Sequence, residues 1–93
     1  MQTFDDETLR TALTELDGWE QDGDRIVREW SFDVFADAVG FIDRVLELAD
    51  EASHHPDLFN SFTTVRISLT THSEGGITEK DLALARRIDA VGT

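Results

Sequence analysis

The chain has 93 residues and a formal net charge of −12, because twenty acidic residues outnumber eight basic ones. A surplus of this size argues against nucleic-acid binding and against an anionic membrane surface, since both need a basic patch. Hydrophobic residues make up 40% of the chain, which is typical of a folded domain and not of a disordered one.

The same composition predicts the cellular setting. There is no cysteine, so a disulfide framework and a thiolate metal site are excluded. The opening sequence MQTFDDETLR lacks the pattern of a signal peptide, and no apolar run approaches the ~20 residues that cross a bilayer. We therefore expect one cytoplasmic domain over residues 1–93. The acidic residues are spread along the chain, which suggests a halophile-like surface adapted to a salt-rich cytoplasm.

The first predicted element is a helix over residues 6–16, where apolar residues recur at helical spacing and acids crowd the first turn. Two strands, over residues 19–21 and 25–32, follow it. They flank the sequence DGD, which is typical of a hairpin turn.

A long helix is predicted over residues 34–52, with Asp33 as its N-cap. Phe41 and Leu48 widen its apolar stripe beyond what one packing surface needs. This excess fits either a contact between subunits or a broad seat on a sheet, and the sequence leaves both open. The predicted core stripe comprises Phe35, Ala38, Val39, Ile42, Val45, Leu46 and Ala49.

Two more strands are predicted over residues 58–62 and 64–71, and His72 would continue the polar face of the second. The sequence TEKD, residues 78–81, resembles a capping box that opens a last helix. The order α-β-β-α-β-β-α predicts an α+β fold, in which three helices pack on one face of a four-stranded antiparallel sheet.

The chain gathers its three histidines, His54, His55 and His72, within nineteen residues. Imidazole exchanges protons near neutral pH better than any other side chain, so the cluster suggests acid–base chemistry. A zinc site is an alternative, but adjacent ligands do not easily turn toward one ion and no H-x-H or H-x-x-x-H pair is present. A purely structural role is the third possibility. No G-x-S-x-G sequence supports a serine hydrolase.

The spacing of these residues resembles a known family signature. Asp50 stands four residues before His54, and the run HHP is followed by Phe62 after five residues, His72 after nine more and Asp81 after eight more. This pattern is similar to that of the pterin-4a-carbinolamine dehydratases, and the resemblance covers nearly the whole chain. It implies dehydration of a 4a-hydroxytetrahydropterin to quinonoid dihydropterin, in tetrahydrobiopterin recycling, without metal or cofactor.

The resemblance also implies roles by position. His54 and His72 would be the acid–base pair, and His55 would bind and orient the pterin. Many relatives have an aromatic residue, typically Trp, where this chain has Leu58. This difference is expected to affect substrate affinity or preference more than the type of reaction. Residues implied at the substrate are Asp50, Ser53, Pro56, Leu58, Thr70, Ser73 and Asp81.

Some of these residues have ordinary alternatives. Asp50 would serve equally as a solvated acid, and Asp81 as a helix-capping carboxylate. Two other functions also stay open: a non-enzymatic binding or dimerisation module, and a dehydratase-like protein acting on another pterin. The resemblance implies a homodimer or homotetramer built through helices and sheet edges.

Overall fold

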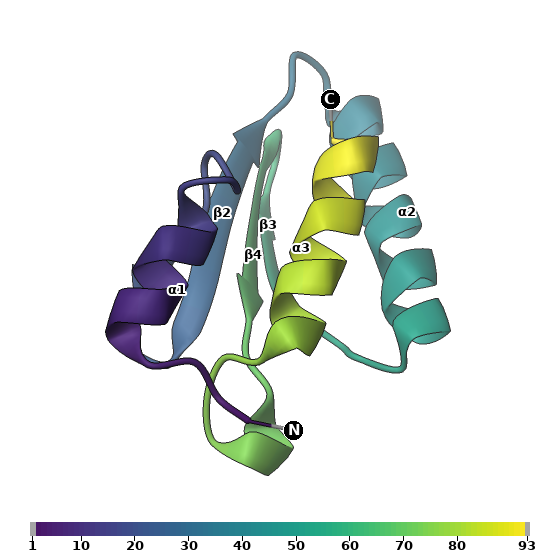
Figure 1. Ribbon diagram of the computed structural model, residues 1–93. Helices are drawn as coiled ribbons and strands as arrows, with labels where there is room; N and C mark the ends of the chain where they lie inside the picture. The colour runs from purple at the N-terminus through teal and green to yellow at the C-terminus, as the bar shows by residue number, and fades with distance from the viewer. Residues whose placement is uncertain (1, 93) are drawn as a thin grey trace.

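A computed structural model describes residues 2–92 as a four-stranded antiparallel sheet with three α-helices on one of its faces (Figure 1). The strand order is β1-β2-β4-β3, so the predicted fold class and element order are confirmed. No helix within residues 2–92 is both long and apolar enough to cross a membrane. The elements are α1 (Asp6–Leu13), β1 (Glu20–Asp22), β2 (Arg25–Ser31), α2 (Phe35–Ala52), β3 (Asp57–Ser61), β4 (Thr64–Leu69), the 3-10 helix η1 (His72–Glu74) and α3 (Glu79–Val91).

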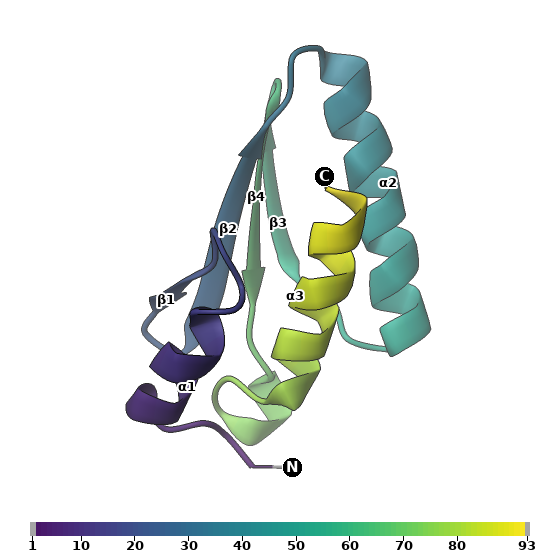
Figure 2. The same ribbon diagram turned by 45° about the horizontal axis from the view of Figure 1, so that its top comes forward.

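Buried and exposed side chains alternate along β2 and β4, so the sheet has one buried face and one face exposed to solvent. Side chains from β2 and β4 that face the helices, such as Ile26 and Ile67, are fully buried. Their neighbours on the other face include Glu29 and Arg66, which stand opposite each other on β2 and β4 and are exposed. The helices α2 and α3 run side by side against the buried face (Figure 2).

The first helix is shorter than predicted. Its N-cap is Asp5, whose carboxylate accepts the Thr8 backbone N–H at 2.7 Å, and this hydrogen bond lowers the pKa of Asp5. The helix ends at Leu13, because the following residues make hydrogen bonds from i to i+3 in place of i to i+4. The tightened turn still brings Leu16 into the core.

The face that α2 buries differs from the predicted one. Phe41 and Leu48 are buried, so they belong to the seat on the sheet and not to an exposed excess. The Phe41 ring centroid lies 4.9 Å from that of Trp30 and 5.2 Å from that of Phe32, and this aromatic cluster turns Phe41 inward. Three residues that were predicted to lie in the core are exposed: Phe35, Val39 and Leu46.

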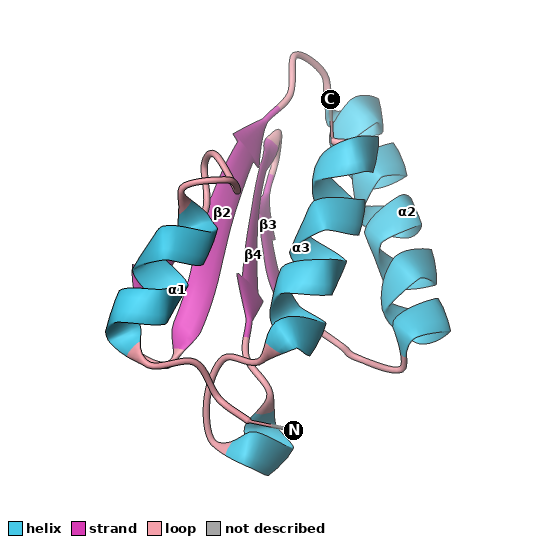
Figure 3. Cartoon of the chain, viewed as in Figure 1, coloured by secondary structure: helices cyan, strands magenta, loops and turns pink. Residues whose placement is uncertain are grey.

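The ends of three other elements are shifted. The N-cap of α2 is Val34 and not Asp33, and no side chain caps it. β3 ends before Phe62, which takes a φ of 51° in the turn to β4. β4 ends at Leu69, so His72 does not continue a strand. It opens η1 in the connection to α3 instead (Figure 3).

Candidate functional site

The end of α2 fixes the position of His54. Ser53 adopts a left-handed conformation, with φ 51° and ψ 39°. Its N–H bonds to the carbonyl of Asp50 at 3.2 Å, and the N–H of His54 bonds to the carbonyl of Ala49 at 3.1 Å. These paired bonds form a Schellman motif, and Pro56 then prevents the helix from resuming. Ser53 therefore acts here through its backbone.

The side chain of His54 is held by a buried carboxylate. Nε2 of His54 lies 2.5 Å from Oδ1 of Asp81, and the two side chains are 11% and 0% exposed. Oδ2 of Asp81 accepts the Thr71 hydroxyl at 2.8 Å and the Thr78 backbone N–H at 2.9 Å. The Thr71 and Thr78 hydroxyl oxygens are 2.8 Å apart. This group of four residues is called the Asp81 network below.

The Asp81 network selects one tautomer of His54. Two donors already point at Oδ2, and a buried carboxylate needs such partners. Oδ1 remains as an acceptor for His54, so Nε2 of His54 is assigned as the donor. This assignment follows from the hydrogen-bond pattern. It leaves Nδ1 as the ring nitrogen that can exchange a proton.

Asp81 fills the capping role that the sequence offered as an alternative, and its contact with a substrate stays a prediction. It is the N3 residue of the capping box at the start of α3, with Thr78 as the N-cap. It is also the partner of His54. Sequence reasoning singled out Thr70 and missed Thr71, but the Thr70 hydroxyl donates to the carbonyl of Asp24 at 2.7 Å, away from this network.

His55 forms a second, exposed pair. Its Nε2 lies 3.0 Å from Oδ1 of Asp50, and the two side chains are 67% and 81% exposed. His54 and His55 thus have different surroundings, as expected for adjacent residues leaving a helix. A contact this exposed adds little stability, so its effect is to orient the imidazole.

The third histidine lies on a loop that starts at the Asp81 network. Thr71 belongs to the network, and His72 and Ser73 follow it as exposed residues of η1. The end of α2, the start of α3 and η1 lie at the same end of the molecule (Figures 1 and 2). The segments that carry the three histidines are therefore gathered there. No three His, Cys, Asp or Glu side chains within residues 2–92 are placed to hold a metal ion.

Two other predicted residues, Pro56 and Leu58, follow the adjacent histidines in the chain. Leu58 is half-buried and packs against the hydrophobic core. Pro56 is half-buried in the connection between α2 and β3. Both lie close to His55 in the chain, and a contact with a substrate stays a prediction for each.

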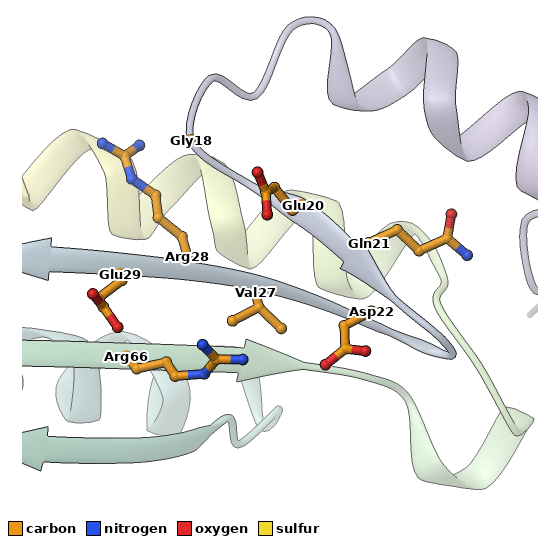
Figure 4. A pocket seen from close by; sticks show the side chains of 8 residues that line it. All are labelled: Gly18, Glu20, Gln21, Asp22, Val27, Arg28, Glu29 and Arg66. Carbon is orange, nitrogen blue, oxygen red and sulfur yellow. The ribbon is translucent and has the colours of Figure 1, made fainter.

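His54 also lines a cavity, of about 210 Å³, between the end of α2 and one side of α3. A larger hollow of about 510 Å³ lies at the β1–β2 hairpin and reaches Arg66 (Figure 4). None of the three histidines lines the larger hollow. The smaller one contains a side chain of the type suited to proton transfer. The residues that line it with His54 are Ala52, Lys80, Ala83, Leu84 and Arg87.

Known proteins resemble this chain over its length. The profile of the family described as Pterin 4 alpha carbinolamine dehydratase matches residues 2–91. A curated relative from Thermomicrobium roseum that bears the family's name is 49% identical over 88 residues, covering 95% of each chain. Another, from Sulfolobus acidocaldarius, is 37% identical and covers 95% of this chain and 97% of its own.

Two solved structures are similar as well. A transcriptional coactivator/pterin dehydratase from Brucella melitensis superimposes with a TM-score of 0.95 at 34% identity, covering 99% of this chain and 100% of that one. A pterin dehydratase-like protein identified as a RuBisCO assembly factor in the alpha-carboxysome superimposes with a TM-score of 0.70 at 27% identity. That match covers 81% of this chain and 89% of the other.

Proposed function

The chain belongs to the pterin-4a-carbinolamine dehydratase family, and from this premise we propose that it removes water from a 4a-hydroxytetrahydropterin. The product is quinonoid dihydropterin, in tetrahydrobiopterin recycling. The observation that supports this most is the hydrogen bond between His54 and the buried Asp81, beside a cavity. A histidine needed only for packing would not require a fully buried carboxylate as its partner.

The reaction breaks the bond between C4a and its hydroxyl oxygen. Hydroxide is a poor leaving group, so an acid must protonate the hydroxyl as it departs as water. An adjacent ring nitrogen then gives up its proton and forms a double bond to C4a. One proton is consumed and one is released, and no electron is gained or lost. The dehydration therefore calls for an acid and a base.

His54 and His72 are the proposed acid and base. In this proposal Nδ1 of the His54 imidazolium protonates the leaving hydroxyl, while the hydrogen bond from Nε2 to Asp81 holds the ring in place. His72, on the exposed loop, takes the proton from the ring nitrogen. General acid and base groups each contribute roughly 10²–10⁴-fold to a rate.

The remaining site residues have positioning roles in the proposal. Asp50 orients His55, whose other ring nitrogen contacts the pterin. Thr71 and Thr78 hold the Asp81 carboxylate in place. Leu58 offers apolar surface to the pterin but no aromatic face.

The test is stopped-flow dehydration of chemically generated 4a-hydroxytetrahydropterin by the purified protein. A rate far above the uncatalysed reaction, with quinonoid dihydropterin as product, supports the proposal. An uncatalysed rate, together with recovery of a specific protein partner, would favour the binding module instead. The structural neighbour described as a RuBisCO assembly factor makes that second candidate concrete.

We also propose that copies of the chain associate as a homodimer or homotetramer through α2. Three exposed residues of α2, namely Phe35, Val39 and Leu46, recur at i, i+4 and i+11, so they form one stripe on the helix. The Phe35 ring stacks on Phe62, with centroids 6.0 Å apart and planes at 13°. Phe62 itself is 71% exposed. An exposed patch of this kind is typical of a protein interface.

A further inference from the structure

The cavity beside His54 has a cationic rim in an acidic protein. Lys80 and Arg87 both line it, although the chain has only eight basic residues and a net charge of −12. Lys80 is the only lysine of the chain. This placement brings positive charge next to the residue that is proposed to perform the chemistry.

The helix α3 supplies most of the cavity wall. Lys80, Ala83, Leu84 and Arg87 recur at i, i+3, i+4 and i+7, so they share one side of the helix. With a rise of about 1.5 Å per residue, Lys80 and Arg87 stand roughly 10 Å apart along the axis. The wall between the two cations is apolar, and His54 belongs to the opposite wall.

The two cations are not equally available to a ligand. The Arg87 guanidinium is 2.9 Å from the Glu51 carboxylate and is therefore already paired. The Lys80 ammonium makes no hydrogen bond or ion pair with any residue in the range 2–92. Arg86, its neighbour on the same helix, pairs with Glu79 at 2.9 Å and does not line the cavity. Lys80 is thus the free positive charge at this site.

The size of the cavity limits what it can enclose. A volume of about 210 Å³ is the room taken by roughly seven water molecules. Cavities that enclose a whole ligand are usually about 300–1,000 Å³. A flat ring held beside His54 would therefore leave its substituents at the rim, where Lys80 lies.

We propose that Lys80 recognises an anionic group on the side chain of the pterin, so that the site prefers a phosphorylated pterin to one with a neutral hydroxylated side chain. This inference rests on the proposed function and specifies its substrate class. An ammonium is a compact charge suited to phosphate. The Glu51 carboxylate beside the cavity is paired with Arg87, and the more distant negative charges are screened beyond about 10 Å at 0.1 M salt.

The experiment compares two stable oxidised pterins, neopterin and neopterin monophosphate, by quenching of pterin fluorescence on binding. Wild type is expected to bind the phosphorylated form about tenfold more tightly, which corresponds to about 1.4 kcal/mol. Lys80→Gln should remove the preference and Lys80→Arg should keep it. Arg86→Gln is the matched control, because it makes the same charge change on the same helix. This variant should also keep the preference for the phosphorylated pterin.

Three results would overturn the inference: equal affinities in wild type, an unchanged preference in Lys80→Gln, or inorganic phosphate competing as well as the phosphorylated pterin. The last would mean a simple anion site. Because binding needs no turnover, the two proposals fail separately. A preference without dehydration overturns the dehydratase, and dehydration without a preference overturns only the role of Lys80.

Discussion

The replacement Asp81→Asn tests how the buried carboxylate controls His54. The substitution keeps the shape of the side chain and removes its charge. The amide oxygen can still accept from Thr71 and Thr78, so the NH₂ group faces Nε2 of His54 as a donor. Neutral His54 then accepts at Nε2 and carries its hydrogen on Nδ1. In protonated His54, the N–H at Nε2 would face the amide NH₂, which is also a donor. Proton transfer through Nδ1 is lost.

The size of both effects follows from these contacts. Loss of a general acid lowers the rate by roughly 10²–10⁴-fold. Three hydrogen bonds to a charge become neutral or are weakened, at about 1 kcal/mol each, so the free energy of unfolding falls by about 3 kcal/mol. A domain with a stability of about 5–15 kcal/mol stays folded after that loss.

The assay is stopped-flow dehydration, combined with urea denaturation to confirm that the variant is folded. Asp89→Asn is the matched control. Asp89 also lies on α3 and accepts from Trp19 Nε1 at 2.9 Å and from Arg28 at 3.0 Å, away from the histidines. The Asp89→Asn variant should lose stability and keep the wild-type rate of dehydration. A folded Asp81→Asn protein with the wild-type rate would refute the reasoning.

Four further predictions concern stability and assembly. Ser53→Gly should raise the free energy of unfolding by about 1 kcal/mol in urea denaturation, because Ser53 is left-handed, and a loss of stability would contradict this. Thr71→Val should cost about 1–3 kcal/mol, because it removes a donor to buried Asp81, and an unchanged urea midpoint would show that this bond contributes nothing. Leu46→Glu should reduce the mass measured by light scattering to that of one chain, and an unchanged oligomeric mass would show that α2 is not the interface. Finally, rising KCl should raise the melting temperature if the acidic surface is an adaptation to salt, and a flat response would exclude it.

Much of the fold could be predicted because local signals agree with the final packing. The apolar alternation around Ile67 and the capping box at residues 78–81 each depend on nearby residues alone. The buried face of α2 could not be predicted in this way. Phe41 and Leu46 belong to two adjacent apolar stripes of the same helix, and only the aromatic rings on β2 decide which stripe turns inward.

The candidate site shows the same limit. The sequence singled out His54 and Asp81 separately, but their contact joins residues 27 positions apart and appears only in the folded chain. Thr71 was missed in favour of Thr70, because alternation along a strand does not reveal where the strand ends. β4 ends at Leu69, so the side chains after it no longer follow the pleat.

The measurement that tests the central claim most directly is single-turnover dehydration by wild type, His54→Ala and Arg86→Ala across pH, in high salt. Arg86 lies on α3, pairs with Glu79 and does not line the cavity, so its replacement controls for a change on the same helix. The account predicts that His54→Ala loses roughly 10²–10⁴-fold in rate while Arg86→Ala keeps the wild-type rate. A folded His54→Ala protein as fast as wild type would contradict it.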